Sequence, residues 1–488
     1  MTDQSPDRIK PAGGGEASLY AQARTIHPRA VKGANRSAKT IIAWLSILSV
    51  SLLPWLRWDR GAGHPDQAIL FDFVAMRAYF LDTELWPQEF YFLTGVLVIA
   101  SIGLFLVTAL YGRVWCGFAC PQTVWTDIFV WIEHRVEGDH NQRRRLDHAP
   151  WSMGKVARKL VKHGAWLAVS LATGASFLFF FNDAPRAARA MLTGDAGIVL
   201  YGFVALVGLM TYVMAGWARE QMCIYMCPWP RFQGAMLDHD SLVVAYDAGR
   251  GESRGHARVA QSFEGRGHCV DCRMCVQVCP VGIDIRDGIQ MECIGCGLCA
   301  DACDSVMPRF GLPRTLVGWR PFSHASSEAP RPEHPQPKQP WHRRPRLMIY
   351  GAIIGVTLAG MAVAGGQRRM LDMTILHDRS PVSVTLSDGS VRNDYTVKIV
   401  NRQRASRLLR LEVFGLAGAR VEVRDLGQTS DGQGLAAAAD AVTTYRVSVR
   451  VPAGPASAGA TPIEFRLSDR ALGDEAVRSN TFIATAAP

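Results

Sequence analysis

Long apolar runs alternate with polar, arginine-rich stretches along most of this chain. A helix needs about 17–25 residues to cross a bilayer, and five of the runs are long enough. The second run contains no charged residue, which favours a membrane helix over a helix in a soluble core. The pattern therefore predicts a polytopic α-helical membrane domain with about five transmembrane helices. The five runs are Ile41–Trp58, Phe90–Tyr111, Val161–Phe181, Ile198–Trp217 and Leu347–Gly365.

A different pattern follows the last apolar run. Segments such as "DYTVKIVNR", "LLRLEVFGL" and "TYRVSVRVPAG" alternate apolar and polar residues, with turn-forming residues between them. Short strands at this spacing are typical of a β-sandwich of about 100 residues. This part contains no cysteine and no group of residues with catalytic spacing, so we interpret it as a docking or positioning module.

The charge of the chain fits the membrane interpretation. It has 53 Lys and Arg against 43 Asp and Glu, a formal net charge of +10, while 48% of its residues are hydrophobic. A basic balance can indicate nucleic-acid binding, but these cations flank the apolar runs. Because that position is typical of topology signals at a membrane, we expect no nucleic-acid partner.

The distribution of the cations predicts the orientation of the chain. Cytoplasmic loops of membrane proteins carry an excess of Lys and Arg. We therefore expect the N-terminus in the cytoplasm and, after an odd number of crossings, the C-terminal β-sandwich outside. The cations before the first, third and fifth runs are Arg24, Arg29, Lys32, Arg36, Lys39, Arg113, Arg135, Arg143, Arg144, Arg145, Lys155, Arg158, Lys159, Lys162, Arg331, Lys338, Arg343, Arg344 and Arg346. The acidic residues between the first and second runs are Asp59, Asp66, Asp72, Asp82 and Glu84.

All twelve cysteines lie in four groups, and none lies in the predicted outer part. A disulfide framework would place cysteines on the oxidising side of the membrane. Their absence there indicates cytosolic metal or redox chemistry. The groups are Cys116/Cys120, Cys223/Cys227, Cys269–Cys279 and Cys293–Cys303.

The last two groups share the spacing C-x₂-C-x₂-C-x₃-C, which is typical of bacterial ferredoxins with two [4Fe–4S] clusters. In that pattern the fourth cysteine of each run binds the cluster of the other run. Structural zinc, the alternative, needs only one Cys-x₂-Cys pair per half-site. Asp304, not proline, follows the last cysteine. We assign Cys269, Cys272, Cys275 and Cys303 to cluster 1, and Cys293, Cys296, Cys299 and Cys279 to cluster 2.

The first two groups share the form C-x₃-C-P, and each follows an apolar run expected to end at the cytoplasmic face. The chain thus has an internal repeat of two helical hairpins that end in the same dithiol. On an α-helix such cysteines face one way, with Cβ atoms about 5–6 Å apart. A disulfide prefers about 3.5–4.5 Å, so the spacing suits two ligands of one soft metal better. The alternative is that these cysteines are buried hydrophobic residues at helix ends.

Two weaker signals lie near the same predicted face. Residues 123–138 have the pattern of an amphipathic helix, which we expect to lie on the membrane. Four histidines could bind metal or haem, although solvated or interfacial histidines are the commoner case. They are His134, His140, His148 and His163.

Several stretches resemble the CcoG/FixG/RdxA family, whose members are accessory proteins for assembly of cbb3-type cytochrome c oxidase. They include "YGRVWCGFACPQTVWTDIFVWIEHRVEG", "QMCIYMCPWPRFQGAMLDHDSLVVAYDAGRGESRG", "ECIGCGLCADACDSVMPRFG" and "SDGSVRNDYTVKIVNR". The resemblance implies a multi-pass protein of the bacterial inner membrane that reduces Cu(II) to Cu(I) for the oxidase's copper centre. It also links Cys116, Cys120, Cys223 and Cys227 to that reaction, and implies an immunoglobulin-like fold for the C-terminal β-sandwich.

The sequence as a whole predicts a multidomain α+β protein and a cupric-reductase-like oxidoreductase. We expect a cytosolic electron donor, with oxidase assembly factors and copper transporters or chaperones as partners. Two other functions remain open: a quinol-oxidising electron conduit, and a non-enzymatic assembly scaffold or metallochaperone. The expected parts are a basic cytoplasmic leader (1–40), a four-helix membrane domain with both C-x₃-C-P motifs (41–235), a cytoplasmic two-cluster ferredoxin domain (236–315), a Pro-rich linker (316–346), a fifth transmembrane helix (347–365) and a periplasmic immunoglobulin-like domain (366–488).

Overall fold

The computed structural model separates into two compact units, 1–361 and 362–488, and each is described by itself. Most of the expected leader and of the Pro-rich linker lies outside the described residues. The described residues are 26–61, 63–258, 261–324, 344–425, 428–430, 434–452, 459–469 and 471–484.

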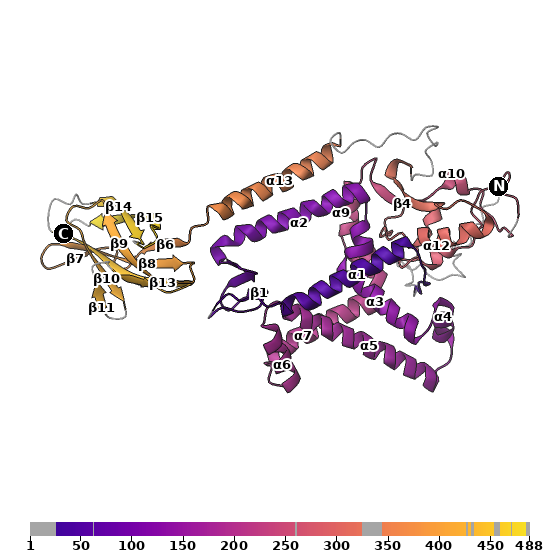
Figure 1. Ribbon diagram of the computed structural model, residues 1–488, viewed down its shortest axis with the longest axis horizontal. Coiled ribbons are helices and arrows are strands. Elements are labelled where there is room, and N and C mark those ends of the chain that lie inside the picture. The colour runs from indigo at the N-terminus through magenta and orange to yellow at the C-terminus, as the bar shows by residue number, and fades with distance from the viewer. Residues whose placement is uncertain are drawn as a thin grey trace, which may run out of the picture. The chain divides into compact units, whose positions relative to one another are not determined.

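Four helices of the described chain are long and apolar enough to cross a membrane (Figure 1). At most 17% of each apolar window is buried inside the protein, so most of these side chains are only partly covered by protein or are exposed. Apolar surface of this extent suits a lipid environment. The helices are α1 (Ala34–Leu52), α2 (Phe90–Tyr111), α7 (Ile198–Thr211) with its continuation to Met226, and α13 (Pro345–Gly366).

The third predicted run differs from the other four. It falls within α5 (Met153–Leu178), whose first turns carry Lys155, Arg158 and Lys159, and this helix does not meet the same limits of length and apolar composition. Four of the five expected crossings therefore correspond to helices that meet these limits. A fifth crossing, by α5, remains a prediction.

Close packing nevertheless joins α5 to α7. A Cβ atom added to Gly174 would lie 2.5 Å from the Val204 carbonyl oxygen, so only glycine permits this approach. Small residues at such contacts are typical of helices that pack together in membranes.

A small antiparallel sheet, absent from the sequence prediction, follows α1. It consists of β1 (Ile69–Asp72), β2 (Arg77–Phe80) and β3 (Thr83–Leu85). The Phe71 amide donates to the Phe180 carbonyl at 2.8 Å, which fixes this sheet to the segment that follows α5. Helix α6 (Ala184–Thr193) then leads to α7. The far ends of α1 and α5 therefore lie on the same side of the helical domain.

The cysteine-rich part folds around a two-stranded antiparallel sheet of β4 (Leu242–Tyr246) and β5 (Val317–Pro321). Between these strands the chain forms short helices separated by loops that carry the cysteines. Buried residues such as Val244, Met307 and Leu316 pack with several cysteines into one apolar core. The helices are α10 (Ala248–Gly251), α11 (Met274–Gln277), η6 (Ile285–Asp287), α12 (Leu298–Val306) and η7 (Met307–Phe310), and η8 (Phe322–His324) follows β5.

A carboxylate of the ferredoxin part caps the first membrane-type helix. Asp301 on α12 accepts hydrogen bonds from the backbone amides of Asn35 at 3.2 Å and Arg36 at 2.7 Å. These amides belong to the first turn of α1, where they have no partner within the helix. A side chain on Gly33 would overlap Asp301. The cap therefore fixes the ferredoxin part against the start of α1.

The C-terminal unit is a β-sandwich, as predicted. One sheet has the order β11-β10-β13-β8-β6 with β7 beside β8, and the other has the order β12-β9-β14-β15. Alternate residues, such as Val397, Tyr445 and Phe465, point into one core between the sheets. The strands are β6 (Leu371–His377), β7 (Val384–Thr385), β8 (Val391–Asn401), β9 (Arg407–Phe414), β10 (Arg420–Asp425), β11 (Gln428–Ser430), β12 (Leu435–Ala437), β13 (Ala441–Val451), β14 (Gly459–Ser468) and β15 (Glu475–Ala484). The multidomain α+β fold is confirmed.

Candidate functional site: two dithiols beside a ferredoxin

The first C-x₃-C-P motif forms a π-helical turn, η3 (Trp115–Ala119), and not the expected α-helix. The Cys120 amide donates to the Trp115 carbonyl, five residues back, at 2.9 Å. Cys120 itself has extended backbone angles, because a residue before proline avoids the helical region. Pro121 then starts α3 (Pro121–Val136) at a position where the missing amide hydrogen has no consequence.

The second motif repeats this geometry in η5 (Met222–Met226). The Cys227 amide donates to the Met222 carbonyl at 2.8 Å, Cys227 is extended, and Pro228 precedes α9 (Trp229–Met236). Single π-turns inside helices are rare and occur frequently at functional sites. The internal repeat thus extends to the backbone.

The two dithiols meet. Cys116 is buried, and burial raises the pKa of its thiol to about 12, with further increases from Cys120, Cys223 and Cys227. These three cysteines therefore lie within electrostatic range of the Cys116 thiol, and Ile224, between the second pair of cysteines, packs against the apolar cluster that contains Cys116. The Cys116 thiol donates to Gln233 Oε1 at 3.1 Å. Residues more than a hundred positions apart are therefore brought to one place.

This place lies directly against a ferredoxin loop. A Cβ atom on Gly117 would lie 2.8 Å from the Cys296 Cα atom, so the two backbones touch. Cys116 and Cys296 belong to one apolar cluster, which also contains Ile294 and, between the second pair of cysteines, Ile224. The first dithiol and a proposed ligand of cluster 2 are thus in direct van der Waals contact through their loops.

Contacts between the two cysteine runs follow the exchange that the sequence predicts. The Cys303 thiol interacts electrostatically with Cys272 and Cys269, although it belongs to the other sequence run. In the same way, Cys299 interacts with Cys279. The second group surrounds one apolar cavity, which is lined by Cys279, Cys293, Cys296 and Cys299 together with Cys275 and neighbouring aliphatic residues. This grouping is what the exchange of fourth ligands requires, and we propose the assigned ligand sets on that basis.

The donor chemistry of both groups fits [4Fe–4S] clusters. All twelve cysteines are free thiols. Burial raises the pKa of Cys275, Cys279 and Cys303 to about 12, so these thiols release protons when they bind iron. Of the eight, Cys272 is exposed, which brings cluster 1 closest to solvent.

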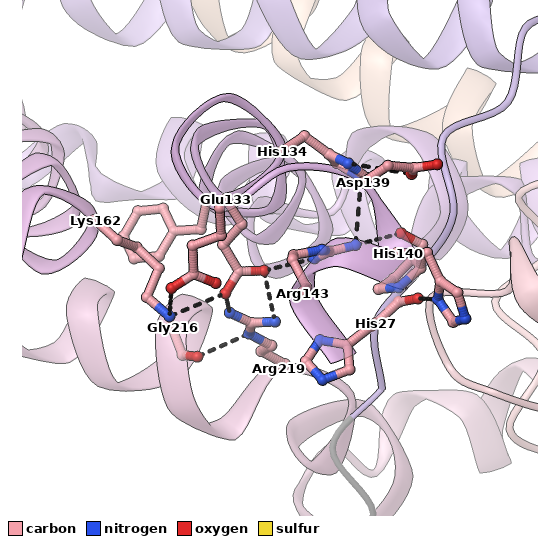
Figure 2. Close-up of polar contacts among 12 residues, drawn as sticks. His27, Glu133, His134, Asp139, His140, Arg143, Lys162, Gly216 and Arg219 are labelled. Carbon is pink, nitrogen blue, oxygen red and sulfur yellow. Dashed lines mark hydrogen bonds and ion pairs between the residues drawn. The ribbon is translucent and has the colours of Figure 1, made fainter. Parts of the chain in front are cut away.

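A buried carboxylate joins the helices that carry the two dithiols (Figure 2). Glu133 on α3 accepts hydrogen bonds from Arg219 at 2.6 and 3.2 Å and from Arg143 on α4 (His140–His148) at 2.9 Å. Lys162 Nζ lies 3.6 Å away. Burial alone would raise the pKa of Glu133, but Arg219, Lys162 and Arg143 outweigh it and lower the pKa. The carboxylate is therefore ionised at neutral pH.

Arg219 occupies the junction between two π-turns, η4 (Tyr212–Ala218) and η5, within the short helix α8 (Arg219–Gln221). Its φ of 39° is uncommon for a residue with a side chain. Its Nε donates to the Gly216 carbonyl at 2.7 Å, and its own carbonyl accepts from Gln122 Nε2 at 3.2 Å. Gln122 comes two residues after Cys120. The first dithiol is thus tied to the junction that precedes the second.

The predicted histidines do not join the thiols in the described contacts. His134 lies 3.7 Å from Asp139 and contacts Arg143, and burial together with Arg143 lowers its pKa. His163 Nδ1 lies 2.8 Å from the Tyr212 hydroxyl. These two rings therefore have structural partners.

The amphipathic pattern of residues 123–138 does form a helix, α3, but its apolar face packs inside the protein. The Phe129 ring stacks on Trp166 of α5 with centroids 5.1 Å apart. The sequence did not indicate Glu133, Arg219 or Gln122 as functional residues. The available signal was the pair Arg219–Glu220 at the end of an apolar run, where charge is uncommon.

Family models match three parts of the chain. Residues 218–321 match a model described as a 4Fe-4S dicluster domain, and residues 93–137 match one described as a 4Fe-4S binding domain. Residues 361–485 match a model of the IG-like fold at the C-terminus of FixG, a putative oxidoreductase. With the apolar helices, these matches define the class: a membrane-bound iron–sulfur electron-transfer protein.

Whole-chain relatives identify the family. The chain is 43% identical to Protein RdxA of Cereibacter sphaeroides over 92% of its own length and 95% of that protein. It is also 43% identical to Nitrogen fixation protein FixG of Rhizobium meliloti, over 89% of its length and 88% of that protein. The chain therefore belongs to the CcoG/FixG/RdxA family. Ferredoxin-type protein NapH of Escherichia coli is 25% identical over 51% of this chain and 79% of its own.

Proposed function

We propose that this protein reduces Cu(II) to Cu(I) for assembly of the copper centre of a cbb3-type cytochrome c oxidase. The observation that carries the proposal is the meeting of both dithiols against the Cys296 loop. Thiolates select soft ions such as Cu(I), so the site prefers the product of the reaction. When bound, the clusters supply electrons one at a time, as this reduction requires.

The residues around the dithiols suit a site that holds copper transiently. Cys116 is protonated at neutral pH, so copper binding must displace its proton. Gln233 Oε1 faces this thiol because the Gln233 amide donates through Nε2 to Thr108 Oγ1 at 3.3 Å. Copper binding ends the hydrogen bond from thiol to amide. Loss of the proton and of this hydrogen bond reduces the affinity of the site for copper. A lower affinity favours release of Cu(I) to a partner.

A redox assay on the purified protein tests the function. Protein prepared and reduced without air should regain its oxidised iron–sulfur absorbance when Cu(II) is added, and a Cu(I)-specific chelator should report the product. A quinol conduit would instead be reduced by quinol and leave Cu(II) unchanged. A scaffold or metallochaperone would do neither, and either result would contradict the proposal.

We further propose that α5 crosses the inner membrane together with the four apolar helices. The far ends of α1 and α5 meet at the β1–β3 sheet, so α5 extends across the same thickness as a membrane-length helix. Five crossings would put the N-terminus and the C-terminal unit on opposite sides of the membrane, and the cations that flank the apolar runs favour the cytoplasm for the N-terminus and the ferredoxin part. The proposed partners are a cytosolic electron donor, oxidase assembly factors, and copper transporters or chaperones.

Reporter fusions test the orientation. A reporter that is active only in the periplasm should be active after Gly194, between α5 and α7, and after Gly366. The same reporter inserted after Asp240 should be inactive. Activity after Asp240, or inactivity after Gly366, would place the clusters or the C-terminal unit on the other side.

A further inference from the structure

Lys39 is a charged side chain buried inside the helical domain, with 1% of its surface exposed. It lies near the start of α1, and its Nζ is 3.1 Å from Asp127 Oδ1 on α3. Arg36 Nη1 lies 3.1 Å from the other oxygen of the same carboxylate. Two cations therefore share one carboxylate, and of these three groups only Lys39 is fully buried.

This charge lies beside the cluster 2 loop. Asn35, one helical turn before Lys39 and on the same face of α1, is so close to Gly297 that a Cβ atom there would lie 2.6 Å from Asn35 Oδ1. Lys39 acts electrostatically on the Cys296 thiol, next to Gly297, and also on the Cys223 thiol of the second dithiol. Its ammonium group is thus within electrostatic range of both.

Cluster 2 has a second cation nearby. Arg113 donates to the Cys293 carbonyl at 3.2 Å and to the Met291 carbonyl, and its charge acts on the Cys293 thiol. The surroundings of cluster 2 therefore include the cations Lys39, Arg36 and Arg113, together with the carboxylates Asp127, which acts on Cys296, and Glu292, which acts on Arg113.

The surroundings of cluster 1 also contain a buried cation. Arg286, which acts on Cys275, is paired with two carboxylates, Asp271 at 2.5 Å and Asp284 at 2.6 Å. Arg273 lies 4.0 Å from Asp271 as well. The two clusters therefore differ in how a nearby buried cation is paired: Arg286 faces two carboxylates, whereas Lys39 shares one carboxylate with Arg36.

We propose that Lys39 raises the reduction potential of cluster 2 and so directs electrons from cluster 1 toward the dithiols. Reduction adds one negative charge to a cluster that four thiolates already make anionic, and a nearby cation stabilises that state. Burial matters because water and salt do not screen the Lys39 charge. Electron flow from cluster 1 to cluster 2 also agrees with the exposure of Cys272, because a soluble donor can approach cluster 1 from solvent. The inference rests on the proposed cluster ligands but does not depend on copper.

Redox titration of the full-length protein, followed by electron paramagnetic resonance, tests this role. We expect Lys39→Gln to make reduction of cluster 2 less favourable by at least tenfold in its equilibrium constant. For one electron, this lowers the midpoint potential by at least about 59 mV. Lys39→Arg keeps the charge and should restore the potential. Cluster 1 is an internal reference, because its midpoint should stay unchanged in both variants, and Cys272→Ser identifies its signal.

Arg36→Gln is the matched control. It removes a cation from the same carboxylate, but the Arg36 side chain is 31% exposed, so its shift should be much smaller. If Lys39→Gln does not assemble clusters, Asp127→Asn keeps Lys39 and removes its opposing carboxylate, so this variant should raise the cluster 2 midpoint, and an unchanged midpoint would contradict the proposal. An unchanged cluster 2 midpoint, an equal shift of both clusters, or equal effects of Lys39→Gln and Arg36→Gln would overturn the proposal. If the wild-type protein did not reduce Cu(II) but the variants still showed the expected shifts in midpoint potential, only the proposed function would be contradicted.

Discussion

The Cys116→Ala variant should lose Cu(II) reduction by about 100-fold or more while it retains the iron and sulfide of two [4Fe–4S] clusters. Removal of even an outer partner of a metal site typically costs 10–100-fold, and this thiol is the buried member of the four that meet. Its loop touches the Cys296 backbone, but Cys116 is not among the cluster thiols. Cys223→Ala, from the other half of the repeat, should behave in the same way.

Two measurements on each variant separate the possible roles of these thiols. The rate of Cu(I) formation reports the dithiol site, and iron and acid-labile sulfide report the clusters. Cys272→Ser is the matched control, because it changes an exposed cysteine of cluster 1 and should lower the iron content. The contrary result is loss of iron in Cys116→Ala. That outcome would assign an iron–sulfur cluster to the four thiols, in keeping with the 4Fe-4S model that matches residues 93–137.

The Glu133→Gln variant should be destabilised by about 3–5 kcal/mol, the usual effect of breaking a buried ion pair by removal of one partner. The change leaves Arg143, Arg219 and Lys162 without their shared carboxylate at a site that is 4% exposed. It also frees Arg219 at the junction before the second dithiol. Copper reduction should therefore fall, whereas the cluster content of the folded protein should not.

Thermal unfolding in detergent, followed by circular dichroism, measures the loss of stability. Asp139→Asn is the control, since this carboxylate is half exposed and lies 3.7 Å from His134. It should change the midpoint very little. Equal midpoints for Glu133→Gln and wild type would show that the buried cluster contributes no net stability.

The effect of Glu133 on stability should depend on pH with a defined sign. Its pKa in the folded protein lies below the ordinary value of 4.5, so the ionised carboxylate stabilises the fold at all pH values above 4.5. This contribution is lost as the pH falls from 4.5 through the folded-state pKa. The difference in stability between wild type and Glu133→Gln should therefore be constant near neutral pH and shrink only in acid. A difference that shrank between pH 8 and pH 6 would point to another group.

Local patterns predicted much of this molecule. The C-x₂-C-x₂-C-x₃-C spacing indicated a two-cluster ferredoxin, since three ligands of each cluster lie on one short loop. Four of the apolar runs were found in helices of membrane length, and strand alternation predicted the β-sandwich. The backbone at the dithiols was predicted wrongly. In a π-turn each amide bonds the carbonyl five residues back, whereas in an α-helix it bonds the carbonyl four residues back, and the same amino-acid pattern is compatible with both.

The amino-acid sequence alone indicated which cysteines are candidate ligands of iron and copper, which runs suit a membrane, and where the β-sandwich lies. These properties depend on side-chain chemistry and on the spacing of residues that are close together in the sequence. Only the tertiary structure brought Cys116 within electrostatic range of Cys223, placed the loop of Cys116 against Cys296, and buried Lys39 within electrostatic range of Cys223 and Cys296. Such contacts join residues far apart in the chain, and they form because the packing of α1, α3 and α12 and the pairing of buried charges fix their distances. No local pattern specifies that packing.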